Sequence, residues 1–223
     1  MKIFLCISML FFSTGTILTA QNIELPTDYV RNSLSSNNNI SERFEGSPYP
    51  EESFQNGTIE IGDKEFESLV RYNGLTDAFE IKNQAGEIIT LLRRPDISID
   101  INDLTYEIID YKDENNNRRQ GYFQILNDGN ILLLKKQGVN KIDAVKAANS
   151  YGRDRPARLE QYEEYFIKVK DSPAKEVRLK KKNILKEIDN KEVKSFVKKN
   201  KLKLKDEAEV IQTLEFADSL KDN

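Results

Sequence analysis

The sequence contains no histidine and no tryptophan, and its single cysteine is Cys6. Without histidine, the chain lacks the side chain that most often acts as a general base and most often binds metals. Without a later cysteine, residues 7–223 have no thiolate chemistry, no zinc–thiolate site and no internal disulfide. Neither a glycine-rich phosphate loop nor a G-x-S-x-G nucleophile elbow occurs. This inventory favours a protein that is not an enzyme and has no cofactor.

Carboxylates are the remaining candidates for chemistry. They gather in or beside two turns: Asp100 and Asp103 in one, Asp110, Asp113 and Glu114 in the other. Such residues can form the carboxylate pair of a glycosidase or the oxygen ligands of Ca²⁺. The spacing of a calcium-binding loop is not met, so we assign no metal ligand and no catalytic residue. A carboxylate-dependent enzyme acting on envelope glycans is the alternative function.

Residues 1–20 have the layout of a secretory signal peptide. Lys2 supplies the positive charge, residues 3–12 are apolar, and the small Ala20 precedes the polar Gln21. The apolar run is shorter than the ~20 residues that a membrane-spanning helix needs. We therefore predict a mature protein that begins near Gln21 and has no transmembrane segment. Its location would be periplasmic or secreted, in a bacterial cell envelope.

Two different compositions follow. Residues 21–55 are polar, with too little apolar surface to offset the entropy of ordering, which predicts a flexible leader. Residues 57–179 contain many short runs of β-branched and aromatic residues separated by turn residues, which predicts an antiparallel β-domain. The clearest hairpin is at residues 121–136, where Asp128 and Gly129 separate two apolar runs. The domain would be either a sandwich or a partly open barrel.

Three local predictions concern irregular or later elements. Leu69 interrupts the apolar alternation of its strand, so we expect a β-bulge there. Residues 139–148 place apolar side chains on one side of a helix, so we expect a short helix. Residues 162–169 and 176–179 are expected to form a second hairpin that completes the β-layer.

From Lys180 onward the apolar residues follow a helical period. Residues 180–223 are therefore predicted to form a lysine-rich tail of short helices packed on the β-domain. Asp189 and Asp206 are the expected helix N-caps. The predicted fold class of the whole chain is α+β, an antiparallel β-meander followed by a short C-terminal helical tail.

Charge is segregated along the chain. Residues 178–205 carry twelve Lys or Arg against three Asp or Glu, a net charge of +9. Residues 21–140 carry twelve basic against twenty-one acidic residues, a net charge of −9. The lysine-rich segment can serve as an anion-binding face, or it can be a solvated surface that complements the acidic β-domain.

Helical spacing groups four of the lysines into a weak anion-binding site: Lys194, Lys198, Lys199 and Lys201. Lysine outnumbers arginine in this segment and aromatic residues are not interleaved, which argues against specific binding of nucleic acid. An anionic polysaccharide, a lipid head group or an envelope protein is the expected partner.

The order of these elements resembles a family of exported proteins common in Bacteroidota. Its pattern is a signal peptide, a G-x-[IV] strand, an [FY]-x-x-L-x-[DN]-G-x-x-x-L hairpin, a Tyr-Phe-Ile strand and a lysine-rich tail of paired helices. The matching residues are 57–59, 123–133, 165–167 and 180–220. The resemblance implies export and brings no catalytic residue. The sequence thus predicts an exported, non-catalytic binding or scaffold protein of the bacterial cell envelope.

Overall fold

One antiparallel sheet of eleven strands and three short helices make up the part of the chain that the computed structural model describes, residues 25–32, 44–83, 85–147 and 153–220. The predicted signal peptide, residues 1–20, lies outside this part. The strand order is β1-β5-β4-β3-β2-β6-β7-β8-β9-β10-β11, and the sheet remains open. The predicted α+β class and antiparallel meander are confirmed.

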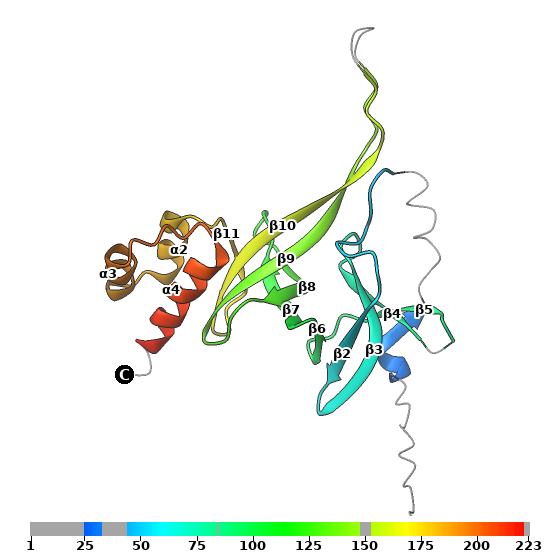
Figure 1. Cartoon of the computed structure of the whole chain (residues 1–223), viewed down its shortest axis with the longest axis horizontal. Coiled ribbons are helices and arrows are strands. Elements are labelled where there is room, and N and C mark those ends of the chain that lie inside the picture. The colour runs from blue at the N-terminus through cyan, green and yellow to red at the C-terminus, as the bar shows by residue number, and fades with distance from the viewer. Residues whose placement is uncertain (1–24, 33–43, 84, 148–152, 221–223) are drawn as a thin grey trace, which may run out of the picture.

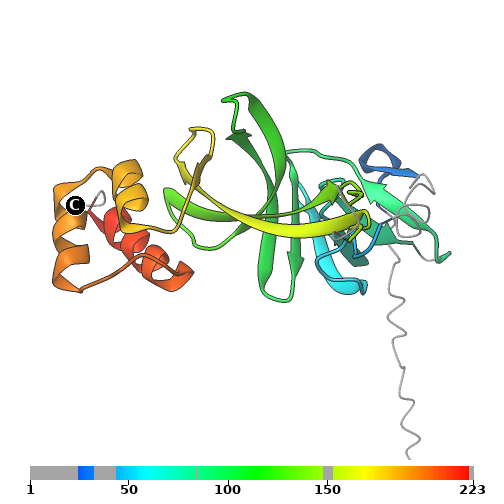
Figure 2. The ribbon, with the colours of Figure 1, turned by 90° about the horizontal axis from the view of Figure 1, so that it is seen from above.

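The helices lie at one end of the long axis and the first strands at the other (Figures 1 and 2). The strands are β1 (Val30–Asn32), β2 (Gln55–Ile61), β3 (Lys64–Asn73), β4 (Ala78–Lys82), β5 (Ile88–Leu91), β6 (Ile97–Ile101), β7 (Leu104–Lys112), β8 (Arg118–Ile125), β9 (Ile131–Ile142), β10 (Arg158–Val169) and β11 (Lys175–Val177). The three helices are α2 (Lys181–Ile188), α3 (Lys191–Lys199) and α4 (Glu207–Ser219), and a 3₁₀ turn, η1 (Thr27–Tyr29), directly precedes β1.

The β7–β8 hairpin is buried on both faces. Ile108 and Tyr122 belong to a first core, formed mainly by β2 to β6. The next residues, Ile109 and Phe123, point to the opposite face and belong to a second core. Because successive side chains of a strand alternate between faces, two consecutive apolar residues on each strand serve two cores at once.

The β9–β10 hairpin repeats this arrangement one layer further on. Leu134 and Phe166 face the second core, whereas their neighbours Leu133 and Ile167 face a third core formed with the helices. The β7–β8 hairpin therefore separates the first core from the second, and the β9–β10 hairpin separates the second core from the third, which the helices cover.

The second half of the sheet curls until the start of its last strand touches β7. The Lys112 N–H donates to the Ala174 carbonyl at 3.1 Å, and the Ala174 N–H donates to the Asp110 carbonyl at 2.8 Å. Inside this curl, the rings of Phe123 and Phe166 meet edge to face with centroids 5.0 Å apart. The second core is thus enclosed by strands on several sides.

The β9–β10 hairpin extends well past β8. Only Gln124 and Ile125 of β8 pair with β9, whereas β9 and β10 pair along all twelve residues of each strand. Beyond that point β9 crosses the β3–β4 turn, where the Val139 N–H donates to the Gly74 carbonyl at 3.1 Å. This hairpin therefore links the first strands to the helices, as Figure 1 shows.

A buried ion pair fixes this crossing. Lys136 on β9 is 6 % exposed, and its Nζ lies 2.9 Å from Oδ2 of Asp77 in the β3–β4 turn. Oδ1 of Asp77 accepts hydrogen bonds from the Tyr72 hydroxyl at 2.7 Å and the Tyr122 N–H at 3.2 Å. Since a buried charge is tolerated only when it is paired and hydrogen-bonded, these partners hold β9 in one position over the first half of the sheet.

Two local predictions are wrong. Strands β2, β3 and β4 pair in continuous register past Leu69, so there is no bulge, and this side chain lies on the solvent face, 39 % exposed. Residues 139–142 continue strand β9 instead of starting a helix at residues 139–148. Pairing with β10, as far as Ile142 opposite Arg158, satisfies the backbone there and overrides the weak helical pattern. The predicted second hairpin is confirmed as β10 and β11.

Two parts of the predicted leader lie against the sheet. Strand β1 pairs with β5, and Tyr29 and Val30 pack against the first core. Nearer β2, the guanidinium of Arg71 lies 3.6 Å from the ring centroid of Tyr49 and 4.3 Å from that of Phe54. These cation–π contacts hold the segment before β2 on the β3 surface.

Side-chain hydrogen bonds cap the starts of α3 and α4. Asn190, and not the predicted Asp189, caps α3 by accepting from the Val193 N–H. Asp189 instead ends α2 in the left-handed conformation, which asparagine and aspartate tolerate. Asp206 caps α4, as predicted, by accepting from the Glu209 N–H at 2.9 Å.

The end of α4 holds the β8–β9 turn. Oδ2 of Asp218 accepts from the N–H groups of Asn130 at 2.9 Å and Ile131 at 3.2 Å. A Cβ at Gly129, whose φ is +123°, would collide with the same carboxylate. The glycine is therefore required both by its backbone conformation and by the approach of α4.

We expect Phe123→Ala to lower the free energy of unfolding by about 3–5 kcal/mol, because the side chain is fully buried in the second core. Urea denaturation followed by circular dichroism measures this change. The control Leu104→Ala removes a side chain that is 40 % exposed and should cost less than about 1 kcal/mol. Equal effects of the two substitutions would contradict the assignment of Phe123 to a core.

We expect Lys136→Met to cost about 3–5 kcal/mol, because it leaves the Asp77 carboxylate without its closest cation. The double variant Asp77→Asn, Lys136→Met should lose less than the sum of the two single variants in a double-mutant cycle. As the control, Lys194→Met breaks an exposed ion pair with Asp189 and should cost less than about 1 kcal/mol. Strict additivity in the cycle would refute the coupling.

Candidate functional site

Two of the candidate carboxylates, Asp110 and Asp113, bind groups at the β7–β8 turn. Asp110 binds Arg118, and this hydrogen bond lowers the pKa of Asp110. Asp113 accepts from the Asn117 N–H at 2.8 Å, which lowers the pKa of Asp113, and Arg119 adds a further bond at 3.2 Å. A glycosidase acid needs a raised pKa, so neither carboxyl group is prepared to donate a proton.

The other acidic pair belongs to a tight turn. Asp100 accepts from the Thr105 hydroxyl across the β6–β7 hairpin at 2.5 Å. Asn102 and Asp103 both have positive φ, which is the conformation of a two-residue hairpin turn. Among the residues that the structure describes, no group of three or more Asp, Glu, His or Cys side chains could hold a metal ion.

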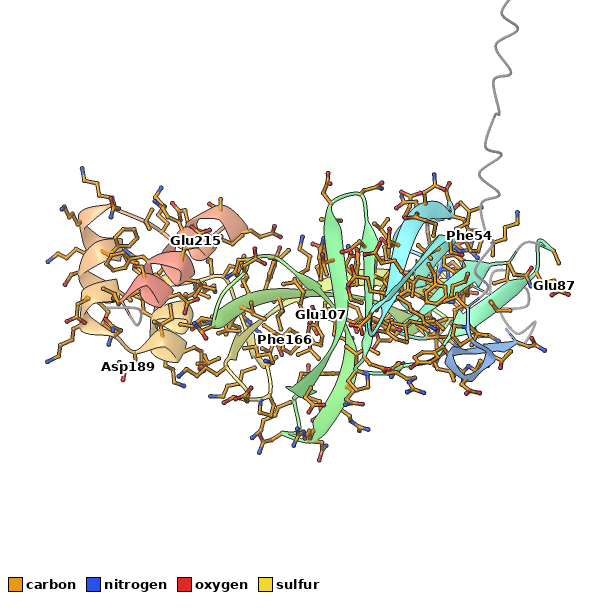
Figure 3. The ribbon with its side chains drawn as sticks, turned by 90° about the horizontal axis from the view of Figure 1, so that it is seen from below. Phe54, Glu87, Glu107, Phe166, Asp189 and Glu215 are labelled. Atoms are coloured by element: carbon orange, nitrogen blue, oxygen red, sulfur yellow. The ribbon has the colours of Figure 1, made fainter. Side chains whose placement is uncertain are left out.

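The four lysines predicted as an anion site lie in or just after α3. Val193 and Val197 of this helix are buried in the third core, and Phe196 stacks on Phe216 with ring centroids 4.1 Å apart. The apolar face of α3 is thus turned toward α4. The lysines are on the other side and exposed: Lys194, Lys198, Lys199 and Lys201. Figure 3 shows nitrogen-tipped side chains projecting from this end of the molecule.

A small hollow adjoins this lysine face, between α2 and α3. Its volume is about 330 Å³, and its lining residues are Lys182, Leu185, Lys186, Asp189 and Lys194. Lys194 Nζ lies 2.7 Å from Oδ1 of Asp189, which lowers the pKa of Asp189. Three ammonium groups against one carboxylate leave the hollow with an excess of positive charge. Lys182 and Lys186 of α2 belong to the lysine-rich segment offered as an anion-binding face, but the four-lysine site predicted from helical spacing includes only Lys194 of the lining residues.

A larger groove lies between β10, β11 and α4 and shares no lining residue with the hollow. Its volume is about 990 Å³. Its lining residues come from three separate segments: Glu163, Glu164, Tyr165, Glu176, Val177, Arg178, Leu179, Lys205, Asp206, Glu207, Ala208 and Ile211. Five of them are acidic and two are basic. The sequence did not reveal this groove, because its walls meet only when α4 packs beside β10.

Ion pairs order the floor of the groove but do not neutralise it. Glu207 lies 2.6 Å from Lys135 Nζ and accepts from the Tyr165 hydroxyl at 2.8 Å. Burial alone would raise the pKa of Glu207, but these hydrogen bonds lower it. Glu164 has the opposite environment, because burial and the nearby Glu176 raise its pKa. A cation bound near Glu164 would relieve that repulsion.

In the described part of the chain, no helix has the length and apolar character needed to cross a membrane. Comparisons of the chain with protein-family models, with curated proteins and with solved structures found no match. Two charged surfaces are the candidate functional sites of the described residues: the lysine face of α3 with its hollow, and the acidic groove beside β10.

Proposed function

We propose that the protein is an exported, non-catalytic binding or scaffold protein of the bacterial cell envelope, and that its lysine face binds an anionic polymer or lipid head group. The sequence of residues 1–20 is the basis for export. The resemblance to exported proteins of Bacteroidota supports the same location.

The observation that carries the proposal is the hollow between α2 and α3. Three lysines line it and Lys194 pairs with Asp189, so the charges of Lys182 and Lys186 exceed the acidic charge of the hollow, while the apolar side of α3 is buried against α4. Lys198, Lys199 and Lys201 extend the positive surface beyond the hollow. Lysines act as hydrated point charges, so the expected binding is weak, salt-dependent and tolerant of sequence or sugar structure.

The alternative function, a carboxylate-dependent enzyme acting on glycans, has no comparable support. Asp110 binds Arg118, and Asp113 accepts from the backbone of its own turn. The pKa values of Asp110 and Asp113 are both lowered, whereas the acid of a glycosidase needs a raised pKa.

We expect the mature protein to be retained on heparin and on vesicles with anionic lipid at ~20 mM salt, where screening is weak. Retention should be lost at or above ~0.15 M salt, where the Debye length is about 8 Å. Replacing Lys194, Lys198, Lys199 and Lys201 by Gln should abolish retention while leaving the unfolding midpoint nearly unchanged.

A matched variant distinguishes binding by the lysine face from an effect of the protein's net charge. It carries Gln in place of four exposed lysines on the β-domain: Lys64, Lys82, Lys112 and Lys146. This variant loses the same charge and should still be retained. If both variants elute together, or if the wild type is not retained at ~20 mM salt, the lysine face is only a solvated surface.

Export has its own test. Expression of the full chain in a Gram-negative host should release a product that lacks residues 1–20 into the periplasm or medium, because the apolar run directs secretion. Intact-mass measurement of the fractionated protein identifies the cleaved bond. Retention of Met1 in a cytoplasmic product would refute export and leave the lysine-face experiment unaffected.

A further inference from the structure

The outer edge of β10 is only partly paired. On one side, β10 pairs with β9 along its whole length. On the other side, β11 covers only Tyr165, Phe166 and Ile167. Near the start of β10, the Leu159 N–H donates to the Glu45 carbonyl at 2.7 Å. Between these two contacts, the described residues provide no strand that pairs with β10.

The hydrogen bonds of β9 identify which groups of β10 face this edge. Gln161 lies opposite Val139, whose N–H is turned away from β10 and donates to Gly74. In an antiparallel pair, residues that do not exchange hydrogen bonds with each other turn their N–H and C=O outward. Gln161 and, two residues on, Glu163 therefore direct their backbone groups to the open edge. Both residues are exposed.

The acidic groove lies where β11 stops pairing with β10. Val177 pairs with Tyr165, but the chain then turns away, with the Lys180 N–H donating to the Arg178 carbonyl at 2.7 Å before α2 begins. If β11 continued along β10, it would enter the acidic groove. Residues 205–208, which are the N-cap segment and first turn of α4, form the far wall of this groove. An extended segment of about four residues spans ~13 Å at 3.3 Å per residue, which covers the interval from Gln161 to Tyr165.

Acidic side chains flank this edge on both faces of the sheet. Glu163 is on the same face as Tyr165, which contacts Glu207 of α4. Glu164 is on the opposite face, as is Glu176, the partner of Phe166 in the register. A strand added here would project its side chains alternately to the two faces, so its basic residues would meet carboxylates on either one.

We propose that the open edge of β10 at residues 161–163 binds an extended, lysine- or arginine-rich segment of a partner protein as an added antiparallel strand. Backbone hydrogen bonds supply part of the affinity, and the acidic groove selects for positive charge. This site is separate from the lysine face, so the inference does not depend on the anion binding proposed above.

The test uses the mature chain and a synthetic peptide probe, acetyl-Lys-Thr-Lys-Val-Lys-Thr-amide, titrated at ~20 mM salt by isothermal titration calorimetry. The Glu-for-Lys version of the peptide should not bind. A version with an N-methyl group on every backbone nitrogen keeps its charge but has no N–H group on either edge to donate to β10. It should bind at least about tenfold more weakly, because it loses the backbone hydrogen bonds of the added strand.

On the protein side, the double variant Glu164→Gln, Glu176→Gln should weaken binding of the lysine peptide by roughly tenfold or more. The matched control is Glu60→Gln, Glu65→Gln, which removes two charges from a cross-strand pair on β2 and β3 and should leave binding unchanged. Thermal unfolding of each variant confirms that it is folded.

Three results would overturn the proposal. The first is no binding of the lysine peptide to the wild type. The second is equal binding of the N-methylated peptide, which would mean attraction by charge without strand addition. The third is equal loss of affinity in the two double variants, which would place the peptide on the acidic surface at large.

Discussion

Two hairpins, β7–β8 and β9–β10, separate three hydrophobic cores, and every later element is held against one of these cores. Each hairpin places consecutive apolar residues on opposite faces, such as Ile108 with Ile109 and Leu133 with Leu134. An antiparallel sheet often leaves one face in water, but these strands do not. A single core would be thin for a sheet of this length, whereas stacked cores share their walls and bury both faces.

The helical tail depends on this arrangement. Its helices have narrow apolar stripes, which are too small to stabilise isolated helices of eight to thirteen residues. They fold by contributing to the third core on β9 and β10, and Asp218 adds hydrogen bonds to the β8–β9 turn. The lysines of the tail are consequently left on its outer surface, where they are available to a partner.

Charged groups in the protein fall into two classes. Lys136 and Glu80 are buried, and each has partners that come from a different element, so these charges specify how the elements meet. The hollow of the lysine face and the acidic groove are open to solvent and share no lining residue. A protein with surfaces of opposite sign at separate places can join an anionic component of its surroundings to a basic one.

The sequence by itself determined the local elements. Alternation along residues such as Ile97, Ile99 and Ile101 identified strands, Asp128 and Gly129 identified a hairpin, and the change of period after Lys180 identified the helices. Those signals are local, because the period of side chains follows directly from backbone geometry. The exposure of the lysines of α3 could be foreseen for the same reason.

Only the tertiary structure decided the rest. The continuation of β9 through residues 139–142 required its pairing with β10, and the docking of β1 required β5. The acidic groove and the open edge at Gln161 arise where chain segments more than forty residues apart meet. Pairing partners and the packing of α4 against the sheet are set by long-range burial, and no periodicity within a single segment encodes them.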